Sequence, residues 1–155
     1  MKELFVSILA HTAPHLPNII LRRMYPAYKL ASGIHFSLPS VGIELDATRC
    51  ELRLKLSVVN VLPFDVTLRH LELEIQPRRE FRLASVQYSR DHKLKAQAET
   101  ILESPTVNIS EKQARQALQN SGALFWLGGE SDLQAPFGTN FTVYIRELNC
   151  LPNVY

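Results

Sequence analysis

Apolar and polar residues alternate along most of the chain after Gly33. The most regular run covers residues 50–58, where charged or polar residues of one parity separate apolar residues of the other. The apolar set consists of Cys50, Leu52, Leu54, Leu56 and Val58. Successive side chains of a strand point to opposite faces, so the run predicts an antiparallel strand with one buried and one solvated face. Cys50 is interpreted as a small core residue.

Shorter alternating runs predict further strands on both sides of this one. Residues 34–38 alternate as far as Pro39, and residues 41–45 alternate again beyond it. The region 123–145 is typical of strands joined by hairpins, and its turn or bulge signals are Gly128-Gly129 and Phe137-Gly138. The last inward face is expected at Phe141, Val143 and Ile145.

The central strand is interrupted by the short step that contains Asn60, Pro63 and Phe64. Proline lacks the amide hydrogen that a sheet ladder needs, so the strand should stop there. The Asn60 side chain is expected to bond to neighbouring backbone groups where the chain leaves one sheet for another. Beyond this step, residues 64–68 and 71–75 have opposite parities, which predicts a bulge near Arg69 or His70.

A single internal helix is predicted after residue 109. Ser110 and Gln113 have the spacing of a capping box, and Gly122 supplies a stop signal. Only Ala114, Ala117 and Leu118 form an apolar stripe. The helix should therefore be short and lie on the surface of the domain.

The first thirty residues have helical rather than alternating periodicity and are assigned to a separate amphipathic segment, residues 1–30, ahead of a β-sandwich domain, residues 31–155. Prolines divide the segment into two short helical pieces, and Pro26 should end the second near Met24. No apolar run reaches the roughly 18 residues that a membrane-spanning helix needs. Its apolar faces either pack on the domain, the favoured interpretation, or lie in a membrane interface beside basic residues. The apolar candidates are Leu4, Phe5, Ile8, Leu9, Ile19 and Ile20, and the basic ones are Arg22 and Arg23.

Charge and composition exclude some classes of function. With 46% hydrophobic and 21% charged residues the chain should fold, and a formal net charge of +2 is too small to predict nucleic-acid binding. Residues 78–95 carry six basic against two acidic residues. They are interpreted first as a solvated loop or edge strand, and otherwise as a contact for an anionic surface. The candidate contacts in this stretch are Arg78, Arg79 and Arg82.

Two cysteines, Cys50 and Cys150, lie a hundred positions apart, which fits neither a zinc ribbon nor a redox pair. Free thiols are expected, although a bridge between them could stabilise an exported protein by about 4 to 5 kcal/mol. The sequons at Asn108 and Asn140 are interpreted as chance matches, and no clear signal peptide supports export. A cytoplasmic or peripheral membrane location is favoured over secretion.

The run LKLSVVNVLPFDVTLRHLELEI resembles the signature segment of the group 2 late embryogenesis abundant proteins, the water-stress and hypersensitive-response domain. Asn60, Pro63 and Phe64 match the family's step, whereas Val61 stands where the family usually has its first proline. TVNISEKQARQAL resembles the strand and single helix that follow, so the resemblance covers roughly residues 34–150. It implies a non-enzymatic, stress-associated or membrane-associated module.

No catalytic motif is present in the sequence: it has no G-x-S-x-G, H-E-x-x-H, Walker or G-x-G-x-x-G pattern. Glu130 and Asp132 are interpreted as part of a polar turn rather than a cation site. We therefore expect no catalytic residue, no metal and no cofactor. The alternative is an unrecognised hydrolase, which would need His35, His70 or His92 beside a carboxylate and a hydroxyl in one pocket.

Together these patterns predict a mainly β fold: an immunoglobulin-like or fibronectin III-like antiparallel sandwich of about seven strands with one short inserted helix. The expected function is binding or scaffolding, through a membrane surface or an acidic protein partner and not through nucleic acid. A structural subunit that forms homo-oligomers through its N-terminal segment is a further alternative.

Overall fold

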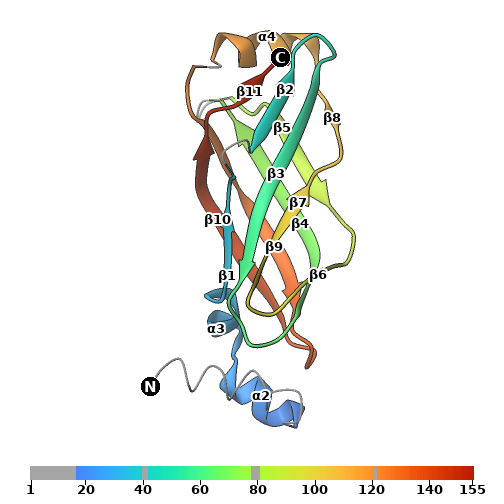
Figure 1. Cartoon of the computed structure of the whole chain (residues 1–155), viewed down its shortest axis with the longest axis vertical. Coiled ribbons are helices and arrows are strands. Elements are labelled where there is room, and N and C mark those ends of the chain that lie inside the picture. Colours follow the sequence, from blue (N-terminus) through green and yellow to red (C-terminus); the bar gives the residue numbers. More distant parts are fainter. Residues whose placement is uncertain (1–16, 40–41, 78–80, 121) are drawn as a thin grey trace.

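The computed structural model describes residues 17–39, 42–77, 81–120 and 122–155. The candidate contacts Leu4, Phe5, Ile8 and Leu9, together with Arg78 and Arg79, lie outside the described residues. Two β-sheets pack as a sandwich, with short helices near the N-terminus and one inserted helix, as the sequence predicts (Figure 1). The helices are α2 (Asn18–Met24), α3 (Ala27–Ala31) and α4 (Glu111–Gln119).

The described residues contain eleven strands, more than the roughly seven expected, because several are only two to four residues long. In chain order they are β1 (Ile34–Ser37), β2 (Ile43–Asp46), β3 (Glu51–Asn60), β4 (Val66–Gln76), β5 (Ala84–Tyr88), β6 (His92–Leu94), β7 (Ala98–Glu103), β8 (Val107–Asn108), β9 (Phe125–Gln134), β10 (Asn140–Cys150) and β11 (Asn153–Val154).

The long strand β3 organises the first sheet. Its first half pairs with β2 and β8, and its second half pairs with β1 and β7. β11 adds to the outer side of β2 in parallel, a pairing that the sequence pattern did not predict. The second sheet has the order β10-β9-β4-β5, and β6 also pairs with β4. β5 and β6 therefore form an edge of this sheet one after the other.

The core lies between the two inner faces. Leu52, Leu54, Leu56 and Val58 of β3 are all at most 2% exposed, so the buried face was predicted correctly. Cys50 packs against this core as a partly buried residue, but it lies in the turn before β3 and not on the strand face. Its φ is positive, 54°, because the chain reverses there to pair β2 with β3.

Asn60 performs the structural role expected of it. Its side chain is fully buried at the end of β3, where the chain crosses to β4 in the other sheet. Nδ2 donates to the carbonyl oxygens of Phe64 (3.0 Å) and Leu94 (3.2 Å), and Oδ1 accepts from the amide of Leu62 at 3.0 Å. One side chain thus joins the crossover to β6.

The change of parity in β4 is a bulge, as predicted. The register with β9 shifts between Leu68 and His70, so that Leu68 and Leu71 both face the core. His70 lies at this bulge but not at an edge, since β4 has strands on both sides.

The glycine signals of the closing region have different roles. Gly138, with φ of +80°, forms the β9–β10 turn as expected. Gly128 and Gly129 lie inside β9 and mark a bulge, which is in the facing strand β10 between Ile145 and Leu148. A Cβ on Gly129 would clash with the carbonyl oxygen of Glu72.

Two further interpretations of this part of the sequence were wrong. Glu130 and Asp132 are strand residues of β9 rather than a polar turn, because the β9–β10 pairing continues through them. Leu118 of α4 is half-exposed, whereas Ala114 and Ala117 are buried, so the apolar stripe of the helix is narrower than expected.

α4 begins with the predicted capping box. The Ser110 hydroxyl accepts from the backbone amide of Gln113 (3.3 Å), and the side-chain oxygen Oε1 of Gln113 accepts from the backbone amide of Ser110 at 2.8 Å. Gln113 Nε2 also donates to the carbonyl oxygen of Leu83 at 2.7 Å. This bond attaches α4 to the segment that precedes β5, so the helix closes one end of the sandwich (Figure 1).

Candidate functional site

Four segments that are distant in the sequence meet at the other end of the molecule (Figure 1). We call this the helical end. It comprises α2 and α3 (residues 17–33), the loop 61–65 after β3, the segment 93–97 and the β9–β10 turn 135–139. Backbone hydrogen bonds connect the segments: the amide of Val61 donates to Gly33 (2.9 Å), and the amide of Gln97 donates to Leu62 (3.3 Å).

One face of the N-terminal helices packs on the sandwich. Leu21, Tyr25 and Leu30 are buried, and the Tyr25 ring meets Phe64 edge to face at a centroid distance of 5.0 Å. Phe64 in turn meets Phe137 of the β9–β10 turn at 5.3 Å. Burying three aromatic rings in one cluster contributes more than their area alone, because their edge-to-face geometry is itself favourable.

Arg22 has a structural role within the domain. Its Nε donates to the carbonyl oxygen of Phe137 at 3.0 Å, which ties α2 to the β9–β10 turn. Pro17 precedes α2 and the helix ends at Met24, as the sequence predicts. The short helix α3 after Pro26 was not predicted, because its five residues hold too little periodicity to be recognised.

Several apolar side chains of the helical end are exposed. Ile19 is 72% exposed and Tyr28 is 77% exposed, and Ile20 and Val61 are each more than two-fifths exposed. Isolated exposed apolar residues are ordinary, whereas a group of them at one end of a domain is typical of contact surfaces. In the described part of the N-terminal segment, residues 17–30, Leu21, Tyr25 and Leu30 therefore pack on the domain as favoured, whereas Ile19 and Tyr28 are exposed.

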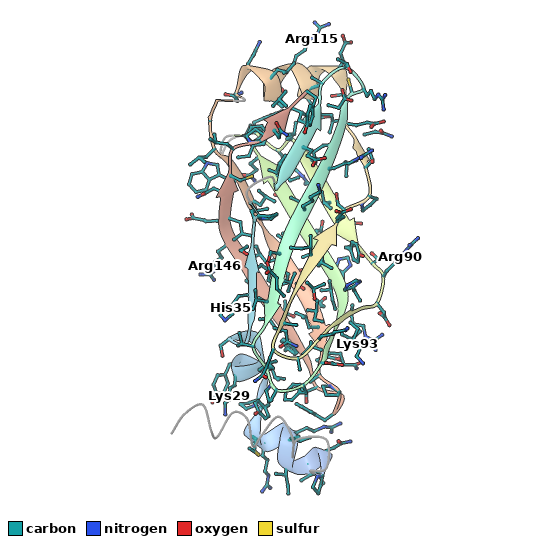
Figure 2. All side chains as sticks on the ribbon, viewed as in Figure 1. Lys29, His35, Arg90, Lys93, Arg115 and Arg146 are labelled. Carbon is teal, nitrogen blue, oxygen red and sulfur yellow. The ribbon has the colours of Figure 1, made fainter. Side chains whose placement is uncertain are left out.

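The helical end also concentrates positive charge. Of the 17 basic and 15 acidic residues of the chain, five basic residues and one acidic residue, Asp65, belong to it, so it carries a formal charge of +4 and the remainder −2. Figure 2 shows Lys29 and Lys93 at this end and Arg115 at the other. The five cations are Arg22, Arg23, Lys29, Lys93 and Lys95.

A cavity of about 560 Å³ opens at the helical end beside α2. At its polar side, Lys93 Nζ lies 2.8 Å from an oxygen of Asp65, whose other oxygen accepts from the amide of Ala96 at 2.8 Å. The bond from Lys93 and that from Ala96 hold the pKa of Asp65 below its ordinary value. The cavity is lined by Asn18, Leu21, Pro63, Phe64, Asp65, Thr67, Lys93, Ala96, Pro136 and Phe137.

Of the basic stretch 78–95, the described residues 81–95 do not form one patch. Its described part runs along the β5–β6 edge of the second sheet, from the α4 end to the helical end. Arg82 pairs with Glu74 at 3.0 Å near the α4 end, whereas Lys93 belongs to the helical end. The structure therefore separates Arg82 from Arg22 and Arg23, and charges along an exposed edge discourage unwanted strand pairing.

The histidines named for a hydrolase lie on three separate strands. His70 Nδ1 is 3.4 Å from the Ser89 hydroxyl, and His92 meets the Tyr88 ring edge to face. His35 lies on β1, on the same side of the molecule as Arg146 (Figure 2). Within the described residues no group of three or more His, Cys, Asp or Glu side chains could hold a metal ion.

Cys50 and Cys150 are free thiols. Burial raises the pKa of Cys150 above its ordinary value, so this thiol is a poor nucleophile at neutral pH. No helix in the described part of the chain is long and apolar enough to cross a membrane.

Sequence reasoning missed Tyr28, Val61 and Phe137 as members of the helical end. Only the apolar step after Asn60 and the Pro-Phe-Gly turn signalled loops with buried anchors, and neither signal tells which loops meet. The cavity and the concentration of charge arise from that meeting.

No protein-family model and no curated protein matches the sequence. The fold is similar to that of SoR45, a Northeast Structural Genomics Consortium target, with a TM-score of 0.51 and 8% identity over 78% of this chain and 88% of that one. The putative ApaA protein from Bordetella pertussis matches with a TM-score of 0.46 and 10% identity over 77% and 89% of the two chains. At this identity the similarity to SoR45 establishes the β-sandwich fold alone.

Proposed function

We propose that this protein is a non-enzymatic binding module whose helical end docks on an anionic membrane surface. The observation that carries the proposal is the coincidence, at one end, of exposed Ile19, Ile20 and Tyr28 with a formal charge of +4. Apolar side chains that enter the headgroup region and cations that meet anionic lipids are the two terms that drive interfacial binding.

The magnitudes are sufficient for reversible docking. Each basic residue near an anionic leaflet contributes about 1 kcal/mol, and each apolar side chain that leaves water fully contributes about 1.5 to 3 kcal/mol. The helices that present these groups are anchored by Leu21, Tyr25 and Leu30, so docking does not require the domain to open. The resemblance to the late embryogenesis abundant group is consistent with such a module and suggests a role in stress.

Vesicle co-sedimentation tests the proposal. Vesicles of phosphatidylserine and phosphatidylcholine should bind the protein, and vesicles of phosphatidylcholine alone should bind it weakly. Tyr28→Glu and the double variant Ile19→Glu, Ile20→Glu should lower the affinity about tenfold or more, because each places a carboxylate in the apolar contact. Tyr144→Glu is the matched control, since Tyr144 is also exposed but belongs to the β10 strand.

Two results of these experiments would contradict membrane docking. If the wild-type protein does not bind anionic vesicles, or binds them equally well after the Tyr28 and Tyr144 changes, membrane docking is wrong. Sizing chromatography of the same variants then separates the alternative of a homo-oligomer, which Ile19→Glu would dissociate, from that of an acidic protein partner.

A further inference from the structure

The strand β10 is an open edge of the second sheet. It pairs with β9 alone and, at eleven residues, is the longest edge strand among the described residues. The other edge of this sheet is divided between the short strands β5 and β6, and β1 at the edge of the first sheet has only four residues. An edge strand presents unpaired backbone groups that can pair with another chain. Strand addition is therefore expected at β10.

The register identifies the backbone groups of β10 that lack a strand partner. The Ala135 amide donates to the carbonyl oxygen of Thr139 at 2.9 Å, so these two residues form a hydrogen-bonded pair at the start of the ladder. The register then continues without a shift over residues 140–145. In an antiparallel ladder hydrogen-bonded and non-hydrogen-bonded pairs alternate. The N–H and C=O groups of Thr142 and Tyr144 therefore point away from β9.

A groove of about 280 Å³ lies between this edge and β1, which belongs to the other sheet (Figure 1). Its lining includes Phe36 of β1 and Val143 and Leu148 of β10, which pack against the core but are only partly buried. Side chains alternate between the two faces of a strand. A strand paired with β10 would thus place every second side chain over these three residues and remove their apolar surface from water.

The groove carries positive charge and no negative charge. Arg146 of β10 lines it, is exposed, and forms no ion pair with any described residue. Figure 2 shows Arg146 and His35, which also lines the groove, on the same side of the molecule. Among the described residues that line the groove, none is acidic. An acidic partner would therefore gain an ion pair, whereas a basic partner would be repelled.

We infer that the open edge of β10 binds an acidic peptide in extended conformation by strand addition. The peptide backbone bonds to Thr142 and Tyr144, and its apolar side chains cover Phe36 and Val143. A carboxylate on the opposite face of the peptide pairs with Arg146. In this mode of recognition the main-chain bonds supply affinity and the alternate side chains supply specificity. The site lies on the strands, so it does not depend on membrane docking by the helical end.

NMR titration with three synthetic peptides of eight residues tests the inference. In the first peptide valine alternates with threonine, and glutamate replaces one central threonine. The second peptide has lysine in place of this glutamate, and the third is the glutamate peptide with every backbone amide N-methylated.

The glutamate peptide should shift the amide signals of Thr142 and Tyr144. The lysine peptide should bind more weakly, and the N-methylated peptide should not bind, because it has no amide donors. Equal binding of the glutamate and lysine peptides, binding of the N-methylated peptide, or no binding of the glutamate peptide would overturn the inference.

A charge exchange tests the contact at Arg146. Arg146→Glu should weaken binding of the glutamate peptide about fivefold or more and strengthen binding of the lysine peptide, because attraction and repulsion change places. Arg90→Glu is the matched control, since Arg90 is also exposed but lies between β5 and β6 at the opposite edge of the same sheet. A similar loss in both variants would show that net charge governs binding and would contradict the site.

Two further variants separate this site from the helical end. Tyr144→Pro removes an outward amide at an edge position, where proline is tolerated, and should abolish peptide binding while vesicle binding remains. Arg23→Gln with Lys95→Gln should lower vesicle binding and keep peptide binding. Sizing chromatography without peptide tests the other occupant of the edge. A dimer that Tyr144→Pro dissociates would show that a second copy of the chain covers β10, and the inference would be wrong.

Discussion

Asn60 is a single polar side chain that fixes the crossover between the two sheets. It lies fully buried where the chain leaves one sheet for the other, and it bonds to the backbone of Leu62 and Phe64 in the crossover and of Leu94 in β6. A buried backbone group without a partner is costly, so a crossover through the interior needs such a side chain. Asparagine suits the position because its amide both donates and accepts.

Replacing Asn60 with alanine should lower the free energy of unfolding by about 3 kcal/mol, because one amide and two carbonyl groups lose their partner in the interior. Urea unfolding measures the change. Asn140→Ala, at an exposed position, should stay within about 0.5 kcal/mol of the wild type. A loss below 1 kcal/mol for Asn60→Ala would mean that water or a rearranged loop satisfies the crossover.

Among the elements, α4 depends most on the interactions at its N-terminal end for its stability. Its apolar stripe is narrow, so the capping box and the bond from Gln113 to the Leu83 carbonyl carry much of its attachment. An isolated helix of nine residues is unstable in water. The helix therefore forms because local capping and tertiary contact act at the same residues.

Ser110→Ala should destabilise the protein by about 1 kcal/mol, the usual cost of losing an N-cap side chain. Gln113→Ala should cost more, about 1 to 2 kcal/mol, because it removes the reciprocal bond and the link to Leu83 together. Urea unfolding is again the measurement, with the exposed Ser37→Ala as control. A smaller loss for Gln113→Ala than for Ser110→Ala would show that the link to Leu83 contributes nothing.

At the scale of the whole molecule, charge is distributed unevenly along the long axis. The helical end has a formal charge of +4, and the other described residues together have −3. Near an anionic surface such a molecule turns its positive end toward the lipid, and the attraction falls off over about one Debye length. Orientation thus follows from where the loops and helices meet rather than from the small net charge.

The double variant Arg23→Gln, Lys95→Gln should reduce affinity for anionic vesicles about tenfold or more at low salt, since each cation contributes about 1 kcal/mol. Lys112→Gln with Arg115→Gln removes the same charge from the α4 end and should change affinity little. Raising the salt concentration should shrink the difference between the two variants. Equal losses for the two would show that net charge, and not its position, governs binding.

The sequence by itself determined the strands within residues 34–75 and 123–145, the buried face of β3, the bulge in β4, the Asn60 crossover and the cap of α4. These features have short-range causes. The alternation of apolar and polar residues indicates which face of a strand is buried, and a capping box acts within four residues. The place of Cys50 in a turn and the close approach of Gly129 to the Glu72 backbone are of another kind, because they depend on how neighbouring strands pair.

Only the tertiary structure decided what the N-terminal residues do and where the candidate site lies. Ile19, Ile20 and Leu21 are consecutive apolar residues, and the sequence cannot tell that Leu21 packs inward while Ile19 points out. That choice depends on Phe64 and Phe137, which reach α2 from distant parts of the chain. The cavity and the positive end have the same origin, because they exist only where four separate segments converge.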